Sequence, residues 1–201
     1  MINTIVFDIG NVLAAFSWEK CLRERGFDEE LILRVGNATV NSKLWKELDR
    51  STTISEELIG QFITQDPEIA DSIREFLVIS YDSVREYDYS SELIEKLKTN
   101  GYKVYLLSNY NGTNYEHAKK NFSFISKVDG GLISYEVGIV KPDMEIYEAL
   151  IAKYNITPCE AVFLDDSKEN TEAAASLGFH TVHFKSLDKA ITELRSLNIN
   201  V

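Results

Sequence analysis

The stretch NTIVFDIGNVLAAFSWEK, residues 3–20, begins with the first strand that the sequence predicts. Its run from Thr4 to Phe7 is continuously apolar instead of alternating, which is typical of a parallel strand buried on both faces. The run ends at Asp8, so we expect the strand to deliver a carboxylate to one end of a sheet. Gly10 stands two residues later, at a position where a second acid would serve a catalytic site.

Three later segments repeat this apolar pattern, and they are Lys103–Leu107, Ala161–Leu164 and Thr181–Phe184. Amphipathic segments of helical length lie between them, and Asn100-Gly101 ends one of these helices. The alternation of strands and helices predicts an α/β fold, a Rossmann-like doubly wound parallel sheet covered on both faces. Gly130-Gly131 is predicted to form a turn, because no nucleotide-binding fingerprint surrounds it.

Residues 16–87 differ from the rest of the chain in composition: they are rich in Glu, Leu, Ile, Arg and Trp and contain no convincing strand. This composition predicts about four helices inserted after the first strand. We therefore expect residues 1–15 and 88–201 to form the α/β core and residues 16–87 to form a small helical cap. The hinges are expected near residues 15–17 and 86–90.

The amino-acid composition excludes some classes of binding partner. The 201 residues include 21 Lys plus Arg and 32 Asp plus Glu, and the net charge of −11 should repel nucleic acid and anionic membranes. Nowhere do 18 apolar residues follow one another, and Cys21 and Cys159 are too few for a disulfide framework. We therefore expect a soluble cytoplasmic protein, a monomer or weak homodimer, with no nucleic-acid or membrane partner. A small phosphorylated metabolite is compatible with this charge, because a metal ion and local lysines set the potential inside a cleft.

Polar residues follow three of the predicted strands. Asp8 ends the first, Ser108-Asn109 the second and Asp165-Asp166 a later one. In an open parallel sheet the carboxyl ends of the strands line the crevice in which ligands bind. If these strands are neighbours, three carboxylates converge on one small volume, where they repel one another unless a cation is present. A hard ion that prefers oxygen ligands, most simply Mg²⁺, is therefore the expected cofactor.

A lysine lies between the second and third of these polar ends, in the segment GIVKPDMEIYEAL, residues 138–150. Pro142 pre-sets the backbone after Lys141, and Asp143 is the expected N-cap of the next helix. A lysine fixed there could meet phosphate oxygens and screen the carboxylates. Each of these residues alone is common at the end of a strand or the start of a helix. An acid, a hydroxyl, a lysine and paired acids in this order are far less common by chance.

Four motifs occur in this order along the chain, and they are FDIGNV, LLSN, KP and FLDD. With them, and with a helical cap inserted after the first, the sequence resembles the haloacid dehalogenase-like (HAD) hydrolase superfamily over nearly its whole length. Within it the sequence most resembles the branch that contains sugar-phosphate phosphatases of the α-glucose-1-phosphate phosphatase type and the N-terminal phosphatase domain of soluble epoxide hydrolase.

The resemblance implies catalytic roles for residues of the first three motifs. Asp8 would attack phosphorus as the nucleophile and become an aspartyl phosphate. Ser108 would hydrogen-bond a phosphoryl oxygen, with Asn109 beside the substrate. Lys141 would balance charge on the nucleophile and on the transferring group.

The resemblance also implies a metal site. Asp8 and the backbone carbonyl of Gly10 would bind Mg²⁺, Asp166 would bind it directly, and Asp165 would support it through water. The expected activity is that of a Mg²⁺-dependent phosphatase acting on a small phosphomonoester, a sugar phosphate, beneath a cap that closes over the substrate and excludes water.

Gly10 departs from the pattern of the superfamily, because most of its phosphatases have Asp two residues after the nucleophile. That side chain protonates the leaving oxygen and then activates water, and a positioned group of this kind is worth about 10²- to 10⁴-fold in rate. Three outcomes stay open: a slow phosphatase, a replacement by another group, or a binding site without turnover. Asn11 could orient a water or the leaving group at the substrate site, and Trp18 could line the cap side of it.

Three other functions compete with the phosphatase. A HAD-fold protein could bind a phosphorylated metabolite in a regulatory role without catalysis, because Gly10 removes the acid. A dehalogenase also lacks that acid, but the pair Asp165-Asp166 would then have little purpose. A signalling receiver domain places its acidic pair on the first strand and its lysine last, whereas Lys141 here precedes Asp165-Asp166.

Overall fold

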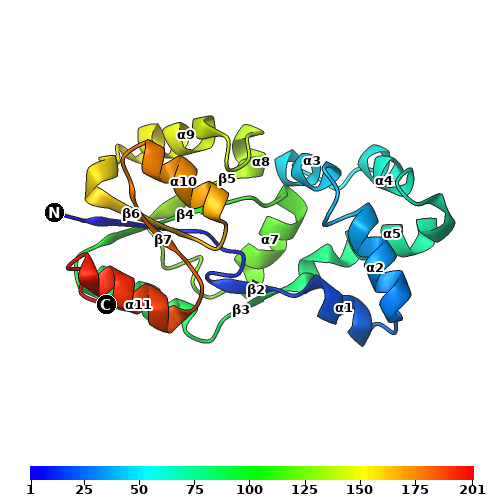
Figure 1. Cartoon of the computed structure of the whole chain (residues 1–201), viewed down its shortest axis with the longest axis horizontal. Coiled ribbons are helices and arrows are strands. Elements are labelled where there is room, and N and C mark those ends of the chain that lie inside the picture. The colour runs from blue at the N-terminus through cyan, green and yellow to red at the C-terminus, as the bar shows by residue number, and fades with distance from the viewer.

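The computed structural model describes residues 1–201, which form two lobes joined by a narrow waist (Figure 1). The larger lobe contains a five-stranded sheet in the order β5-β4-β1-β6-β7, and every neighbouring pair is parallel. Its strands are β1 (Thr4–Phe7), β4 (Lys103–Ser108), β5 (Gly130–Ile133), β6 (Ala161–Asp165) and β7 (His180–His183). This doubly wound order confirms the predicted fold, and β1 lies between the two strands whose polar ends were expected to meet it.

Helices cover both faces of the sheet (Figure 1). The helices of this lobe are α6 (Ser90–Thr99), α7 (Gly112–Asn121), α8 (Ser134–Val137), α9 (Met144–Tyr154), α10 (Lys168–Ser176) and α11 (Leu187–Ser196), with the short turn η3 (Pro158–Glu160). Ile5 and Phe7 of β1 pack with residues of α6, α7 and α11, whereas Val6 packs with residues of α9 and α10. Burial on both faces is the reason that the run from Thr4 to Phe7 is continuously apolar.

The prediction that Gly130-Gly131 forms a turn is wrong, because these residues begin β5. The Tyr154 hydroxyl exchanges hydrogen bonds with the N–H and C=O of Gly131, at 2.8 and 2.9 Å. A Cβ at Gly131 would also lie only 2.9 Å from the backbone oxygen of Leu106 on the neighbouring strand. The close approach of these neighbours requires glycine here, and a strand that starts with two glycines has no side-chain pattern to reveal it.

The smaller lobe, which we call the cap after its predicted role, is the helical insert between strands β2 (Ala14–Phe16) and β3 (Val84–Glu86). Its elements are α1 (Trp18–Glu24), α2 (Glu29–Ala38), α3 (Leu44–Arg50), α4 (Glu56–Ile63), η1 (Pro67–Ile69), α5 (Ala70–Ile79) and η2 (Ser80–Ser83). They enclose a separate apolar core that contains Leu22, Leu48 and Phe76. The helical insert is therefore confirmed, with five α-helices where about four were expected. The assignment of residues 16–87 to a cap domain stays a prediction.

The two connections between the lobes form one antiparallel ribbon. Ala14 pairs with Glu86 and Phe16 with Val84, so β2 and β3 lie side by side at the expected hinges. The expectation of no strand within residues 16–87 is wrong for β3, since a strand of three residues is too short to show a periodic pattern. No helix in the structure has both the length and the apolar character needed to cross a membrane.

Candidate active site

The carboxyl ends of β1 and β6 bring three carboxylates together. Asp8, Asp165 and Asp166 each offer an oxygen, and these oxygens lie within 4.8 Å of one another. Asp8 follows β1 directly, and its N–H donates to the Leu164 carbonyl at 2.9 Å, so the two strands hold the cluster in register. The sequence predicted this convergence on the condition that the strands are neighbours, and β1 and β6 do pair.

The loop after β1 connects this cluster to the ribbon between the lobes. The side-chain N–H of Asn11 donates to Asp166 Oδ2 at 2.9 Å, and the Asn11 side-chain oxygen accepts from the Phe16 N–H at 3.1 Å. Asn11 has a φ of 55°, in the left-handed region that Asn tolerates better than most residues. Asn11 therefore lines the site and also fixes one of the acids.

Lys141 is 2% exposed, and its ammonium lies between the carboxylates of Asp8 and Asp165. Its Nζ is 2.8 Å from Asp8 Oδ1, 2.6 Å from Asp165 Oδ2 and 2.9 Å from the Leu107 carbonyl oxygen. Burial alone would lower the pKa of Lys141, but the carboxylates of Asp165 and Asp8 raise it. Lys141 therefore stays charged, and these three acceptors match the three donors of its ammonium group.

Asn109 holds the loop that carries Lys141. Its amide oxygen accepts from the Lys141 N–H at 2.8 Å, and its amide N–H donates to the Lys141 carbonyl at 3.0 Å. Asn109 also lines the cavity, beside Ser108, which ends β4 and is buried. Asp143 occupies the expected N-cap position of α9, but its side chain pairs with Arg50 of the cap at 3.2 Å instead of capping the helix.

Asp165 is fully buried and has a complete set of partners. Besides Lys141, it accepts from the Ser167 N–H at 2.8 Å and from the Asn170 amide at 3.0 Å. Asp166 instead lines the cavity. The two neighbouring acids therefore differ in exposure: Asp166 faces the space where a ligand would bind, and Asp165 lies behind it.

The charge of the cluster fits a divalent cation. Three carboxylates and the ammonium of Lys141 leave two negative charges in a buried place. Burial raises the pKa of Asp8 to about 6, although Lys141 acts in the opposite direction. An oxygen-binding ion such as Mg²⁺ would remove this repulsion and keep Asp8 ionised. The residues present therefore fit the expected metal, and Asp8, Gly10 and Asp166 line the cavity.

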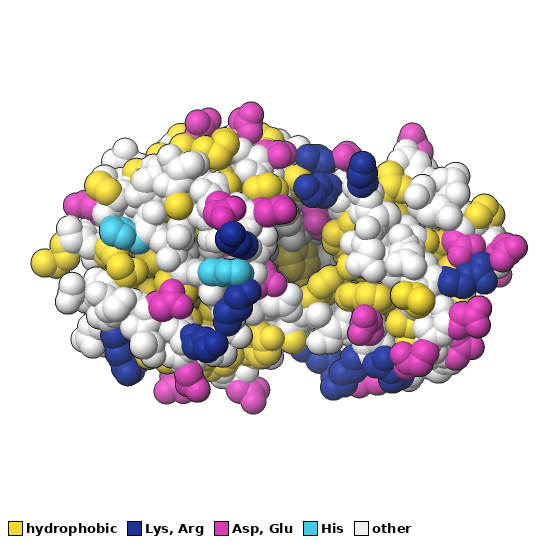
Figure 2. All heavy atoms as spheres, in the orientation of Figure 1, with side chains coloured by type: hydrophobic (Ala, Val, Ile, Leu, Met, Phe, Trp, Pro, Cys, Tyr) yellow, Lys and Arg dark blue, Asp and Glu magenta, His cyan; other side chains and the backbone are white.

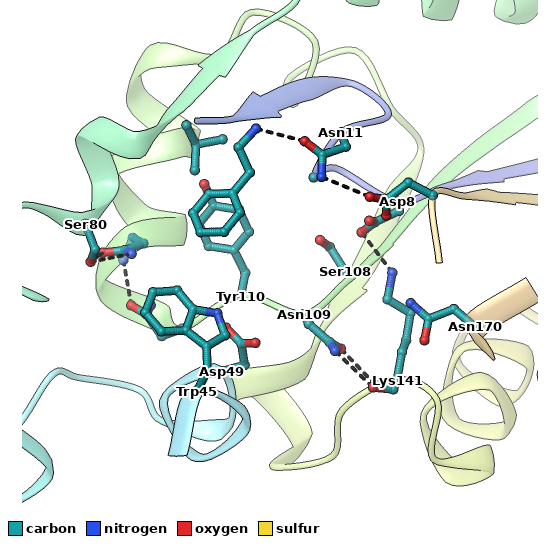
Figure 3. A pocket seen from close by; sticks show the side chains of 16 residues that line it. Asp8, Asn11, Trp45, Asp49, Ser80, Ser108, Asn109, Tyr110, Lys141 and Asn170 are labelled. Carbon is teal, nitrogen blue, oxygen red and sulfur yellow. Dashed lines mark hydrogen bonds and ion pairs between the residues drawn. The ribbon is translucent and has the colours of Figure 1, made fainter. Parts of the chain in front are cut away.

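A cavity of about 150 Å³ opens above these residues, in the hollow between the two lobes (Figure 2). We call it the interlobe cavity, because both lobes line it (Figure 3). The larger lobe contributes Asp8, Gly10, Asn11, Ser108, Lys141 and Asp166, among others. The cap contributes Trp45, Asp49 and Ser80. A compact ligand bound here would contact both lobes at once.

The expectation that Trp18 lines the cap side of the cavity is wrong. Trp18 packs in the cap core against Phe76, with ring centres 6.3 Å apart, and a Cβ at Gly36 would lie 2.3 Å from its ring. Trp45 takes that place in the cavity wall, where its ring lies 6.0 Å from that of Phe16 and 6.2 Å from that of Phe76. Local sequence does not distinguish the two tryptophans, since both lie in amphipathic helices.

Asp49 is a cavity residue that the sequence did not reveal. It is 9% exposed, and its side chain points into the cavity beside Tyr110 (Figure 3). Burial raises the pKa of Asp49 to about 8, and the nearby charge of Asp8 adds to the effect. One signal was available: Trp45 and Asp49 are four residues apart on α3, so they share a helix face.

This chain belongs to the haloacid dehalogenase-like hydrolase family, because a model of that family matches residues 2–178. Among curated proteins it is 26% identical over 196 residues to a sesquiterpene phosphatase of Aspergillus oryzae, covering 96% of this chain and 94% of that protein. It is also 25% identical over 199 residues to a D-ribitol-5-phosphate phosphatase of Bacteroides thetaiotaomicron, covering 90% and 91% of the two chains.

Solved structures share the fold. A HAD family enzyme from Bacteroides thetaiotaomicron, in complex with magnesium and inorganic phosphate, superposes with a TM-score of 0.70 at 23% identity, covering 93% of this chain and 96% of the other. A dehalogenase superposes with a TM-score of 0.73 at 20% identity, covering 100% and 98%. Both phosphatases and dehalogenases therefore occur among the similar proteins. The choice between these two activities depends on the side chains of the site.

Proposed function

We propose that this protein is a Mg²⁺-dependent phosphatase that hydrolyses a small phosphomonoester, a sugar phosphate, through an aspartyl-phosphate intermediate on Asp8. The observation that carries the proposal is the cluster of Asp8, Asp165 and Asp166 at the interlobe cavity, with the Lys141 ammonium paired to the first two. Two curated phosphatases are similar to this chain over nearly their whole length, and they support the same activity.

Residues of the larger lobe would each have a different role in the reaction. The Asp8 carboxylate attacks phosphorus as the bond to the leaving oxygen breaks, and water then hydrolyses the aspartyl phosphate. Lys141 holds Asp8 in place and offsets its charge, and the Ser108 hydroxyl donates to a phosphoryl oxygen. Asp8, Asp166 and the Gly10 carbonyl, with Asp165 behind them, would hold Mg²⁺, which would supply positive charge for the phosphoryl group.

The acidic cluster favours a phosphatase over a dehalogenase. Two of its three carboxylates line the cavity, where they would repel a haloacid, since that substrate carries a carboxylate of its own. A phosphate ester is anionic as well, but a Mg²⁺ ion held by the cluster would offset the negative charge of both the acids and the ester. The excess of acids is useful to the reaction only if it holds a cation.

The rest of the cavity lining suits a sugar phosphate. Amide and hydroxyl groups contribute most of the polar wall, namely those of Asn109, Asn111, Asn114, Asn170 and Ser80. The buried amide of Asn114 donates to Ser80 Oγ at 2.9 Å, so this part of the wall is fixed before a ligand arrives. Neutral donors and acceptors fit sugar hydroxyls, and the rings of Phe16 and Trp45 offer a flat apolar surface to the carbons of a sugar.

Phosphate release from a panel of esters tests this function. The panel contains sugar phosphates, polyol phosphates and a prenyl phosphate, each with Mg²⁺ and with EDTA. We expect release that needs Mg²⁺, favours the sugar or polyol esters, and disappears in Asp8→Asn. Glu169→Gln is the matched control, because Glu169 is exposed and lies outside the cavity on the helix that follows Asp166. Binding of sugar phosphates without any release would identify a non-catalytic binding protein instead.

A further inference from the structure

We propose that Asp49, on helix α3 of the cap, is the catalytic acid and base of this enzyme and replaces the carboxylate that is missing at Gly10. This inference rests on the phosphatase function proposed above. A phosphatase of this kind has two protons to move: one must reach the leaving oxygen, and one must leave the attacking water. Gly10 has no side chain to move either of them.

The other titratable groups that line the interlobe cavity either have another role in the proposed reaction or are poor proton donors. Asp8 is the nucleophile, and Asp166 belongs to the metal cluster. The three donors of Lys141 already have their partners in the closed site. Burial raises the pKa of Tyr110 above its usual value, so its phenol is a poor acid near neutral pH. Asp49 is the titratable side chain of the cavity that none of these roles uses.

Three contacts with the larger lobe hold the C-terminal end of α3 beside the cavity. The Ser134 hydroxyl donates to the Asp49 carbonyl at 2.6 Å, and the Gly112 N–H donates to the Ser51 carbonyl at 3.0 Å. Arg50 pairs with Asp143 at 3.2 Å. The contacts therefore involve residues 49, 50 and 51 in succession. A side chain that served only the cap core would not need its own backbone to be anchored to the other lobe.

The surroundings of Asp49 favour its protonated form before the reaction. Burial and the nearby Asp8 carboxylate raise the pKa of Asp49, whereas Lys141 and Arg50 act against them. A phosphate ester in the cavity would add negative charge and strengthen the effect. A carboxyl group that is neutral near pH 7 is able to donate a proton, and the carboxylate it leaves is a strong enough base to take one back.

The proton and the electron pairs balance over the two steps. In the first, Asp8 forms a bond to phosphorus, the bond from phosphorus to the leaving oxygen breaks, and the proton of Asp49 moves to that oxygen, which departs as an alcohol. In the second, the Asp49 carboxylate takes a proton from water, the water oxygen bonds to phosphorus, and the bond to Asp8 breaks. Inorganic phosphate leaves, and Asp49 is protonated again.

Position 10 has room for the missing acid, which provides a rescue experiment. A Cβ at Gly10 would meet only Asp8 Oδ2, at 3.8 Å, and its backbone does not have a positive φ. Asp is therefore tolerated there. In Gly10→Asp the usual acid and Asp49 would be present together, so the two positions could substitute for each other.

The test compares wild type, Asp49→Asn, Gly10→Asp and the double variant on an alkyl phosphate and on p-nitrophenyl phosphate, with Glu47→Gln as the control on the same helix. The alkyl leaving group needs a proton, whereas p-nitrophenolate leaves without one. We expect Asp49→Asn to lower the rate on the alkyl ester by about 10²- to 10⁴-fold. The loss on the aryl ester should be much smaller, and Gly10→Asp should restore the alkyl rate of Asp49→Asn.

Two results would overturn the role of Asp49: an unchanged alkyl rate in Asp49→Asn, or equal losses on both esters, which would indicate positioning alone. An alkyl-ester activity that appears only in Gly10→Asp would also overturn it, because the wild-type cavity would then lack an acid. Asp8→Asn separates these results from a failure of the phosphatase function. If wild-type turnover disappears in Asp8→Asn, the function stands whatever Asp49 does.

Discussion

Asn109 and Lys141 exchange two hydrogen bonds, from the Lys141 N–H to the Asn109 side-chain oxygen at 2.8 Å and from the Asn109 amide to the Lys141 carbonyl at 3.0 Å. A side-chain amide thus pairs with both backbone groups of one residue. The pairing joins the end of β4 to the loop that carries the central lysine. Besides the substrate contact predicted for it, Asn109 thus fixes the backbone of Lys141 and so positions its ammonium.

Asn109→Ala should impair catalysis by displacing Lys141. Two hydrogen bonds are lost, each worth about 0.5–1.5 kcal/mol, and the loop is no longer tied to β4. We expect kcat to fall by about tenfold or more, with a smaller change in KM, because the proposed mechanism has the lysine act on the reacting groups. Steady-state kinetics on the best ester of the panel measure this. Asn121→Ala, which removes an exposed hydrogen bond far from the cavity, should leave both constants unchanged. A KM effect alone would instead mean that Asn109 only binds substrate.

Mg²⁺ should stabilise the protein through the carboxylate cluster. Binding to the folded state raises the free energy of unfolding by about 2.7 kcal/mol at a concentration of 100 times Kd, so the melting temperature should rise with added Mg²⁺ and fall back with EDTA. Asp166→Asn should lose most of this shift, since it removes a proposed metal ligand from the cavity side of the cluster. Glu169→Gln removes an exposed acid three residues away and should keep the shift. Equal shifts in both variants would place the metal elsewhere.

The sequence predicts the sheet well because its central strands are buried on both faces. Local sequence pattern is enough to find the apolar runs at residues 4–7 and 161–164 and the acids that follow them. Because the two strands are parallel neighbours, these acids lie close together. The strand that begins at Gly130-Gly131 was not predicted, because it has no side-chain periodicity. The Tyr154 hydroxyl and the neighbouring backbone keep that strand in place. Local pattern fails where a distant contact decides the structure.

The cap side of the site was harder to predict for the same reason. Trp18 follows the first strand closely in sequence, which suggested a place at the cavity, but helix packing turns it into the cap core. Asp49 lies 41 positions after Asp8, and the helix face that it shares with Trp45 does not by itself indicate that α3 folds back onto the larger lobe. Its place depends on Ser134, Gly112 and Asp143, which come from three later segments.

Asp49→Asn should stabilise the protein at alkaline pH. The pKa of Asp49 is raised from its ordinary value near 4 to about 8 by burial, so between these pH values the folded protein keeps a proton that the unfolded chain has lost. The contribution of Asp49 to the free energy of unfolding therefore decreases as the pH rises through this window. Asn cannot ionise, so the variant should gain at least about 1.4 kcal/mol over wild type at pH 8, the equivalent of one pKa unit.

Urea denaturation from pH 4.5 to pH 8.5 in EDTA measures this gain, which should shrink towards the acid end. Asp8 stays in both proteins, so its own raised pKa cancels in the comparison. Other charged groups near Asp49, or on the helices α3, α4 and α8 around it, are also common to both, namely Lys141, Arg50, Tyr110, Asp143, Lys46, Glu47, Glu56, Glu57 and Glu136. Glu47→Gln, an exposed acid on the same helix, should show no such gain. A parallel pH dependence in Asp49→Asn and wild type would mean that Asp49 is ionised throughout.

Gly112→Ala should separate the cap from the larger lobe at the point where Asp49 is anchored. Gly112 is the first residue of α7, and a Cβ there would lie 2.3 Å from the Thr52 carbonyl oxygen, in the cap segment that directly follows α3. The backbone of Thr52 must move away to admit the methyl group, and residues 49–51 would move with it. Ala favours the helix over Gly by about 0.5–1 kcal/mol, which offsets part of the cost, so stability should change little while activity falls.

Gly60→Ala is the matched control for that variant, because Gly60 lies within helix α4 of the cap and a Cβ there meets nothing within 4 Å. If Asp49 supplies the proton, Gly112→Ala should slow the alkyl phosphate more than p-nitrophenyl phosphate, as Asn does at position 49, whereas Gly60→Ala should slow neither. Equal losses on both esters would indicate that the closed cap shields the site from water without contributing the acid. The two variants thus distinguish a cap that only covers the substrate from one that brings a catalytic group to it.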